Sequence, residues 1–338
     1  MNLAAMQYCP AVLTPGFDTY SPAGLRSVFN GRKVSHVLPY DSPASGDGEE
    51  AEKFIENRER LSISGVQEKL SLILEGNELR LTEAGEPGTY ILKPIPRDVN
   101  KTAEVPANEH LTMQLARQVY GIPTAENALI FFKSGEPAYI TKRFDIRPDG
   151  RKWRKEDFAS LAGMTKETGG VDFKYESSYE EIGLLIKRFV PSWRVEIERY
   201  FTLVIFNYVF SNGDAHLKNF GLLETEAGDF TMSPAYDLLN TRIHISDTDF
   251  ALKKGLFADG SKSLLWTRTG SPQKDDFLRF AEQIGVSSRR VEGLLSPLLT
   301  RQPAVEELVS HSFLSPRIKT AYLNYYYQKL NRFRQYYD

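Results

Sequence analysis

The segment 212–220, NGDAHLKNF, carries the side chains best suited to chemistry. Asp214 and Asn219 have the D-x-x-x-x-N spacing with which kinase catalytic loops hold a base at a substrate hydroxyl and an oxygen ligand on Mg²⁺. Asp237 follows at the place of a second metal-binding carboxylate. An oxygen-only pair from Asn219 and Asp237 suits Mg²⁺, which takes phosphate oxygens and waters as its remaining ligands. The spacing therefore predicts phosphoryl transfer from a polyphosphate.

Phosphoryl transfer also requires positive charge at the phosphates and a backbone loop that covers them. Lys93, on a predicted strand, is the candidate cation, and Glu109, on the following predicted helix, is its candidate ion-pair partner. The segment 62–69, SISGVQEK, lies where the covering loop is expected. Its single glycine matches neither the G-x-G-x-x-G nor the Walker pattern, so general motifs do not identify it.

Each of these residues also has a purely structural interpretation. An Asn-Gly-Asp tripeptide between a helix and a strand is commonly a turn closed by an Asx hydrogen bond, and Asp237 after Ser-Pro can cap a helix. Lys93 and Glu109 can be solvated, and His216 is equally consistent with a structural histidine. The order along the chain favours phosphoryl transfer, because the lysine and the helix glutamate come first and the D-x-x-x-x-N pattern and the later aspartate follow.

A small sheet lobe is predicted to position Lys93. KLSLIL and ELRLT alternate on either side of a turn, which predicts a hairpin. YILK, ENALIFF and PAYITKRF predict three further short strands, and one amphipathic helix runs from Pro106 to Tyr120 with an i, i+4 apolar stripe. These elements predict an α+β lobe with a mostly antiparallel sheet.

Beyond residue 145 the pattern becomes helical. The run 193–211 is apolar on most of its circumference, which predicts a central buried helix, and Leu323, Tyr327, Leu330 and Phe333 predict a C-terminal docking helix with a basic outer face. The remaining predicted elements are helices at 179–190, 274–284 and 290–299 and strands at 220–223 and 230–232. We therefore predict a leader and linker (1–60) that packs on the small lobe, a small ATP-binding lobe (61–145) and a larger helical catalytic lobe (146–338).

Composition narrows the functional classes. The 338 residues carry 42 basic and 44 acidic side chains, a net charge of −2 with histidine neutral, so no overall charge attracts nucleic acid or anionic lipid. Cys9 is the single cysteine, which excludes an intramolecular disulfide and a multi-thiolate metal site. No apolar run approaches the roughly 18 residues of a membrane span, and the N-terminus lacks a signal-peptide pattern. We expect a cytoplasmic protein that contacts DNA only through a partner and does not bind membranes.

Several stretches together resemble the HipA family of bacterial serine/threonine kinase toxins. The matching segments span about residues 60 to 240 and occur in the family's order: SISGVQEKLSL, YILKP, NEHLTMQLA, ITKRFD, EDF, NGDAHLKNFGLL and SPAYDLL. The resemblance implies a bilobal, protein-kinase-like fold with a small antiparallel-sheet N-lobe. It also implies an ATP- and Mg²⁺-dependent protein serine/threonine kinase.

The resemblance implies a role for each matching residue. Asp214 would be the catalytic base, Asn219 and Asp237 the Mg²⁺ ligands, and Lys93 the contact to the nucleotide phosphates. The remaining implied nucleotide contacts are Ser64, Gly65, Val66, Gln67, Glu68 and Lys69 in the phosphate loop, Lys142, Arg143 and Phe144 in the adenine hinge, and His216, Lys218 and Tyr236. The family typically has glutamate where Lys142 stands, which puts a side-chain contact to the base or ribose in doubt.

Two features resemble the HipT branch of this family. About sixty residues precede the loop, fewer than a full-length HipA toxin has there, and Ser62 and Ser64 form an S-x-S pair like the HipT autophosphorylation motif. This branch implies a HipBST-type toxin–antitoxin system with a HipS-like small protein and a HipB-like helix-turn-helix antitoxin. Family precedent implies growth inhibition by phosphorylation of a translation component such as an aminoacyl-tRNA synthetase.

Two alternatives stay open at the level of the sequence. Small-molecule kinases of related fold also use an aspartate, an asparagine five residues later and a further metal-binding aspartate. A non-catalytic protein could instead bind nucleotide and antitoxin and influence operator binding. The fate of the transferred phosphate separates the first alternative from a protein kinase, and loss of Asp214 separates the second.

Overall fold

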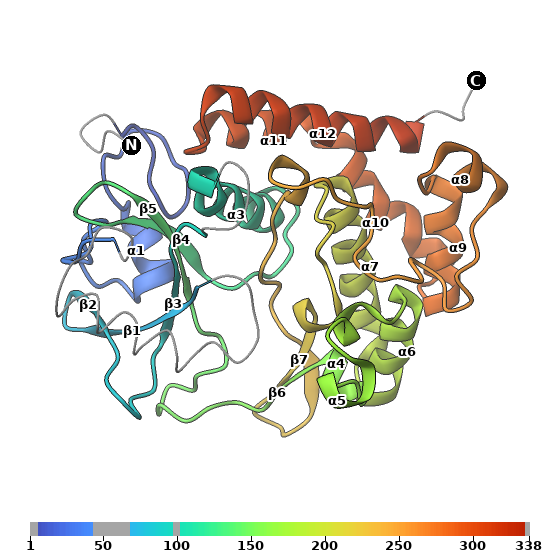
Figure 1. Ribbon diagram of the computed structural model, residues 1–338, viewed down its shortest axis with the longest axis horizontal. Coiled ribbons are helices and arrows are strands. Elements are labelled where there is room, and N and C mark those ends of the chain that lie inside the picture. Colours follow the sequence, from blue (N-terminus) through green and yellow to red (C-terminus); the bar gives the residue numbers. More distant parts are fainter. Residues whose placement is uncertain (1–5, 43–67, 97–101, 335–338) are drawn as a thin grey trace. The chain divides into compact units, whose positions relative to one another are not determined.

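The structure is a computed structural model that describes residues 6–42, 68–96 and 102–334 (Figure 1). The chain falls into two compact units. The first comprises residues 1–115, 125–146 and 306–319, and the second comprises residues 116–124, 147–305 and 320–338, so that the chain crosses between them several times. The first unit contains the larger sheet and the second contains most of the helices.

The first unit is built on a five-stranded sheet with the order β2-β1-β3-β5-β4. Every neighbouring pair in this sheet is antiparallel. The predicted hairpin is confirmed, since Leu72 to Glu75 pair with Glu78 to Leu81 around the turn at Gly76. The strands are β1 (Leu70–Glu75), β2 (Glu78–Leu81), β3 (Tyr90–Lys93), β4 (Asn127–Phe131) and β5 (Pro137–Lys142).

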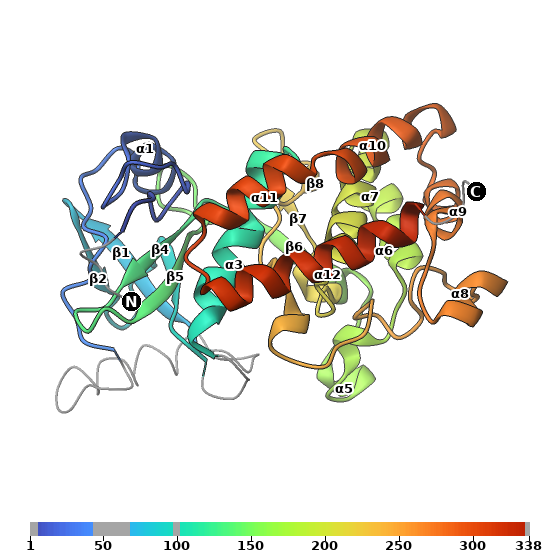
Figure 2. The ribbon, with the colours of Figure 1, turned by 90° about the horizontal axis from the view of Figure 1, so that it is seen from above.

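Two helices, α1 (Pro22–Phe29) and α3 (Val105–Gln114), cover opposite faces of this sheet (Figures 1 and 2). Successive strand residues point to opposite faces. Leu92 therefore joins the apolar cluster around Phe29 of α1, whereas the adjacent Lys93 points to α3. The sequence pattern did not indicate α1, whose N-cap is the side chain of Ser21 accepting a hydrogen bond from Gly24 N at 3.1 Å.

Residues 6–42 are closely joined to the sheet. Tyr20 donates its hydroxyl proton to the Leu129 carbonyl at 2.7 Å, and Tyr90 donates to the Val28 carbonyl at 2.9 Å. Cys9 is a buried free thiol in the same apolar cluster. Residues 1–5 and 43–60 of the predicted leader and linker lie outside the described residues.

The α3 helix departs from the amphipathic pattern expected for it. Its apolar stripe is buried as predicted, but all ten residues of the helix are buried, including the polar ones. The polar side chains satisfy their hydrogen bonds inside the unit: Thr112 donates to the Asn108 carbonyl at 2.9 Å, and Gln114 donates to the Asn127 side chain at 3.0 Å. Buried polar groups are stable when they are paired in this way.

The second unit is organised around α7 (Trp193–Val209), which is predominantly buried as predicted. The flanking helices α6 (Tyr179–Phe189) and α10 (Ser288–Thr300) pack against it (Figure 2). The other elements are β6 (Lys155–Asp157), β7 (Gly221–Glu224), β8 (Phe230–Met232), α4 (Phe158–Leu161), α5 (Lys166–Gly169), α8 (Leu264–Thr269) and α9 (Lys274–Ile284).

The last two helices, α11 (Gln302–His311) and α12 (Pro316–Arg334), contribute residues to both units. The apolar face of α12 differs from the predicted one. Tyr322, Tyr326 and Leu330 are fully buried, whereas Leu323 and Tyr327 are only half-buried. Lys329, expected on a basic outer face, is also fully buried.

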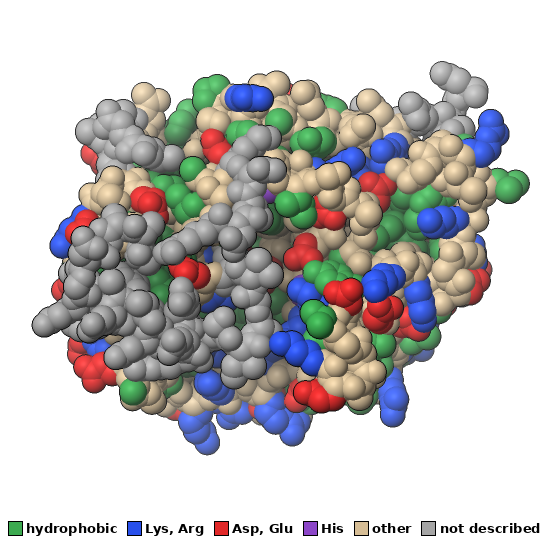
Figure 3. Space-filling view, in the orientation of Figure 1, with side chains coloured by type: hydrophobic (Ala, Val, Ile, Leu, Met, Phe, Trp, Pro, Cys, Tyr) green, Lys and Arg blue, Asp and Glu red, His purple; other side chains and the backbone are tan. Residues whose placement is uncertain are grey.

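Basic and acidic side chains are interspersed on the surface of the second unit that Figure 3 displays, in keeping with the near-neutral net charge. Among the described residues, no helix is both long and apolar enough to cross a membrane. The α+β class with an antiparallel sheet and a large helical part is confirmed. The predicted three-part division into domains stays a prediction.

Candidate active site

The loop that carries Asp214 begins with a tight reversal at the end of α7. Ser211 adopts a left-handed backbone with φ 56°. Asn212 then turns back, because its amide N–H and its side chain both donate to Asn207 at 2.8 Å. The Asn212 side chain in turn accepts a hydrogen bond from Asp214 N at 3.3 Å, which is the Asx turn that the tripeptide suggested. The structural interpretation of Asn-Gly-Asp is therefore correct, and the same turn presents Asp214.

Gly213 is held against a later segment of the same unit. Its N–H donates to the Thr241 hydroxyl oxygen at 2.9 Å, and Thr241 donates to an Asp247 carboxylate oxygen at 2.6 Å. A side chain at position 213 would collide with this segment, since a Cβ there would lie 2.3 Å from Asp247 Oδ2 and 2.7 Å from the Thr248 carbonyl oxygen. The close approach explains why glycine occupies the position before Asp214.

We expect Gly213→Ala to destabilise the protein by about 1–3 kcal/mol, the usual cost of overpacking a closely packed site. Gly293→Ala on α10 is the matched control, because a Cβ there meets nothing within 4 Å and alanine favours a helix by about 0.5–1 kcal/mol over glycine. Urea unfolding of both variants measures the difference. Equal stability of the two variants would show that the Asp247 segment yields to the added methyl group.

The Asp214 carboxylate is partly exposed to solvent and is hydrogen-bonded on one side. Its side chain is 52% exposed, and one carboxylate oxygen accepts a hydrogen bond from the Tyr175 hydroxyl at 2.9 Å. Loss of hydration by partial burial, together with the negative charges of Asp247 and Asp237, raises the pKa of Asp214. The hydrogen bond from Tyr175 and the positive charge of Lys174 act to lower it. A raised carboxylate pKa makes Asp214 a stronger base than a solvated aspartate.

His216 shapes the loop as a neutral side chain. Burial and the charge of Lys174 lower its pKa to about 3, so the ring carries no charge near neutral pH. The ring packs edge-on against Tyr175, with 5.3 Å between centroids. Its backbone N–H donates to Asn219 Oδ1 at 3.2 Å and so helps to fix the asparagine.

Asn219 and Asp237 lie side by side, with 3.4 Å between Asn219 Nδ2 and Asp237 Oδ2. Asp237 has a left-handed backbone with φ 57°, a conformation that non-glycine residues adopt mainly where function or packing imposes it. The pair offers oxygen ligands that fit a hard divalent cation. For both side chains to hold one ion, the Asn219 amide must turn its oxygen toward Asp237. Within the described parts of the chain, no cluster of three or more histidine, cysteine or acidic side chains suggests a different metal site.

Lys218 and Tyr236 are joined on the same side of the loop. The Tyr236 hydroxyl donates to the Lys218 carbonyl at 2.8 Å, and Lys155 of β6 lies over the Tyr236 ring at 4.3 Å from its centroid. The second unit thus brings together the residues expected in its part of the site: Asp214, His216, Lys218, Asn219, Tyr236 and Asp237.

The first unit holds a second group of predicted residues. Lys93 of β3 donates to a carboxylate oxygen of Glu109 on α3 at 2.6 Å, with side-chain exposures of 5% and 4%. The Lys93 amine also lies 5.3 Å from the centre of the Tyr139 ring. The two residues are a buried ion pair rather than the solvated side chains of the structural interpretation.

The predicted hinge begins at Lys142, the last residue of β5, and the chain leaves the first unit shortly after it, beyond Ile146. The Lys142 amine donates to the Asn30 side chain at 2.7 Å, and Arg143 forms a two-point ion pair with Asp145. The backbone N–H of Arg143 donates to the Thr89 carbonyl at 2.8 Å. The Lys142 side chain is thus bonded at the end of α1, while Phe144 is half-buried.

Part of the predicted phosphate loop lies outside the described residues: Ser62, Ser64, Gly65, Val66 and Gln67. Glu68 and Lys69 are described and lie half-buried directly before β1.

Three functional candidates were missed by the sequence patterns: Tyr175, Thr241 and Asp247. Tyr175 lies 39 residues before Asp214, and Thr241 lies 28 residues after Gly213. Asp247 reaches the loop through Thr241. No spacing rule connects positions so far apart, so no signal in the sequence points to these three residues.

Comparisons with known proteins identify the family of the chain and its relatives. Residues 61–305 match the model of the HipA-like C-terminal domain family. A putative kinase of Haemophilus influenzae is 26% identical over 332 residues, covering 91% of this chain and 92% of that protein. The serine/threonine-protein kinase toxin HipA of Shewanella oneidensis is 28% identical over 211 residues, or 56% of this chain and 45% of the toxin. The chain thus spans nearly all of the first relative and about half of the second.

The fold has a counterpart among solved structures. HipA from the Shewanella oneidensis complex of HipA, HipB and operator DNA matches with a TM-score of 0.61 and 22% identity, over 86% of this chain and 66% of that chain. At this identity the match speaks for the fold. The family model covers well over half of the chain, and the motifs at 212–220 and 233–239 lie inside the matched range. The chain belongs to the HipA-like C-terminal domain family.

Proposed function

We propose that the chain is an ATP- and Mg²⁺-dependent protein serine/threonine kinase. The observation that carries this proposal is the loop of the second unit, in which Asp214 is anchored through Gly213 and bonded by Tyr175, with Asn219 and Asp237 adjacent. The buried Lys93–Glu109 pair of the first unit supplies the positive charge that phosphoryl transfer requires at the phosphates. Relatives named as kinases support the same activity.

The residues divide the work of phosphoryl transfer. Asp214 accepts the proton of a serine or threonine hydroxyl as the hydroxyl oxygen forms its bond to the γ-phosphorus and the bond to ADP breaks. Lys93, oriented by Glu109, binds the phosphate oxygens of ATP. Asn219 and Asp237 would hold Mg²⁺, which neutralises the charge of the phosphates. Backbone groups around Phe144 bind adenine, because the Lys142 side chain and the Arg143 N–H are already bonded within the unit.

We further propose that this kinase is the toxin of a HipBST-type toxin–antitoxin system. A HipB-like helix-turn-helix antitoxin and a HipS-like protein would be its partners, and operator DNA would be contacted through the antitoxin. The Shewanella oneidensis HipA that shares this fold was solved in complex with HipB and operator DNA, which supports an antitoxin partner. The protein substrate would be a translation component such as an aminoacyl-tRNA synthetase.

Autophosphorylation at Ser62 or Ser64 would regulate the kinase. A phosphoserine adds about −1.5 to −2 charges, and at Ser62 or Ser64 it would lie beside Gly65 to Lys69, which are proposed to bind the phosphates of ATP. Repulsion between the two anions would displace the loop and lower activity. A double Ser62→Asp/Ser64→Asp variant with unchanged ATP affinity and turnover would contradict this regulation.

Incubation with γ-labelled ATP tests the proposed activity. The expected result is label in the chain itself, reduced by Ser62→Ala/Ser64→Ala, and label in a protein substrate. Label found only in a soluble metabolite would identify a small-molecule kinase instead. Absence of transfer with retained antitoxin binding would favour the non-catalytic alternative.

Tyr175→Phe is expected to shift the acidic limb of the kcat–pH profile to higher pH. The Tyr175 hydroxyl lowers the pKa of Asp214, so its removal raises that pKa further. Asp214 accepts a proton only when it is deprotonated, and a higher pH is then needed for the same activity. Tyr8→Phe, in the first unit, is the control and should leave the profile unchanged. A profile that does not move in Tyr175→Phe would show that this hydrogen bond does not tune the base.

A further inference from the structure

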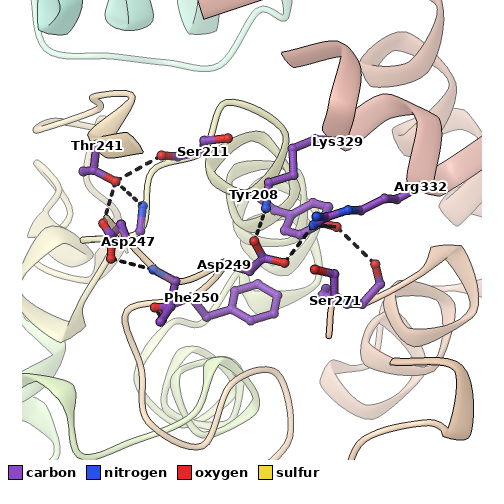
Figure 4. A network of polar contacts seen from close by, with 12 residues as sticks. Tyr208, Ser211, Thr241, Asp247, Asp249, Phe250, Ser271, Lys329 and Arg332 are labelled. Carbon is purple, nitrogen blue, oxygen red and sulfur yellow. Dashed lines mark hydrogen bonds and ion pairs between the residues drawn. The ribbon is translucent and has the colours of Figure 1, made fainter. Parts of the chain in front are cut away.

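The segment 247–250 of the second unit contains two aspartates, Asp247 and Asp249, whose side chains contact different parts of that unit (Figure 4). Asp247 is linked through the Thr241 hydroxyl to Gly213, directly before Asp214, and Asp249 is bonded to the C-terminal helix α12. None of the sequence motifs includes this segment. Its residues nevertheless form a continuous set of contacts between α12 and the candidate catalytic loop.

The α12 end of the segment is a buried charge cluster. The Asp249 carboxylate pairs with the amine of Lys329 and, at 2.9 Å, with the guanidinium of Arg332. Lys329 is 0% exposed, and its amine also lies 4.1 Å from the centre of the Tyr208 ring on α7. Burial lowers the pKa of Lys329 to about 8, although Asp249 opposes that shift. A fully buried lysine is costly unless it is paired, so Asp249 is held firmly in place.

The neighbouring aromatic residue makes the segment rigid. Phe250 packs against four rings of the same unit, with centroid distances of 5.4 Å to Tyr179, 5.8 Å to Tyr208, 5.8 Å to Trp266 and 6.4 Å to Phe277. Tyr208 therefore contacts both Phe250 and Lys329. Packing of this density leaves the backbone at 249–250 little freedom to shift.

The other end of the segment fixes the loop before Asp214. Asp247 accepts a hydrogen bond from the Thr241 hydroxyl, and the Thr241 hydroxyl oxygen accepts one from the Gly213 N–H. Gly213 also lies directly against the Thr248 carbonyl. Any displacement of the segment would therefore move Gly213, both through the hydrogen bonds and through direct contact.

We propose that Asp249, Lys329 and Arg332 are positioning residues for Asp214, acting through the Asp247–Thr241–Gly213 contacts. The C-terminal helix α12 thereby sets the geometry of the catalytic loop without contacting substrate. This inference rests on the proposed kinase function. It extends that function, because it assigns a role to a part of the chain that lies outside the matched family range, which ends at residue 305.

Lys329→Met and Thr241→Val test the proposal in the full chain. Methionine keeps the length of the lysine side chain without its charge, and valine keeps the shape of threonine without its hydroxyl. Each variant is expected to lower kcat roughly tenfold or more, the scale that small misplacements of a catalytic group produce, with KM for ATP within about twofold of the wild type. Thr241→Ser, which retains the hydroxyl, should recover most of the lost kcat.

The double variant Lys329→Met/Thr241→Val separates positioning from general destabilisation. If both residues act along one route, the double variant should lose no more kcat than the more severe single variant. A product of the two single losses would overturn the proposal, as would a Lys329→Met variant whose kcat stays within about twofold of the wild type. Arg290→Gln, which breaks the exposed Arg290–Glu198 pair between α10 and α7, is the control and should not change kcat.

Hydrogen exchange provides a readout that does not depend on activity. Lys329→Met should increase amide exchange in the peptide around Gly213, while the sheet of the first unit exchanges as in the wild type. Unchanged exchange at Gly213 would contradict the proposal even if the variant were unstable. Lack of transfer by the wild-type chain would instead refute the proposed kinase function, and the exchange experiment would still decide whether α12 positions the loop.

Discussion

Replacing Asp214 by asparagine is expected to lower kcat for protein phosphorylation by roughly 10²–10⁴-fold, the usual contribution of a general base. Asparagine keeps the shape of the side chain and can still bond to the Tyr175 hydroxyl, but it cannot accept the substrate proton. Because Asp214 is half exposed, the change should cost little stability. Steady-state measurements with labelled ATP give kcat, and ATP titration should give an unchanged affinity.

Asp229→Asn, in the exposed turn between β7 and β8, is the matched control for this change. It removes one carboxylate from the same unit without touching the loop and should retain full activity. Transfer by Asp214→Asn within a few-fold of the wild type would exclude Asp214 as the base. If cells that produce the Asp214→Asn variant were still inhibited in growth, the non-catalytic interpretation would be favoured.

The second large effect is expected at the buried Lys93–Glu109 pair. Removing one member breaks a buried ion pair, which costs about 3–5 kcal/mol. We therefore expect both Lys93→Met and Glu109→Leu to lower the free energy of unfolding by that amount. Urea unfolding followed by circular dichroism measures the loss, and activity should fall in both variants.

The double variant Lys93→Met/Glu109→Leu distinguishes a catalytic from a structural role. Replacing a buried ion pair by apolar side chains is often neutral or stabilising, so most of the lost stability should return. Activity should not return, because the cation proposed to bind the phosphates of ATP is missing. A double variant that is both stable and active would mean that the pair serves the fold alone. One that stays as unstable as the single variants would show that the site tolerates no apolar replacement.

Much of the fold follows from local patterns. Alternation in the stretches 69–74 and 78–82 predicts a hairpin that forms where expected, because the period of two fits one buried face of a sheet. The run 193–211 predicts a buried helix for a similar reason, since apolar residues cover most of its circumference. Sequence patterns did not predict the burial of residues whose environment is set by tertiary packing. The polar residues of α3 are buried because partners elsewhere in the chain satisfy them, and no single helix reveals that.

The amino-acid sequence by itself determined which residues are available for chemistry. Asp214, Asn219 and Asp237 are identified by order and spacing, because the loop that carries two of them is short and its geometry is local. Only the tertiary structure brought Tyr175 and Thr241 to that loop, and only tertiary packing buried Lys329 against Asp249. These contacts join residues 28 to 80 positions apart. Residue spacing predicts contacts only within one turn or one helix, whereas the position of a catalytic group depends on how segments distant in the sequence pack together.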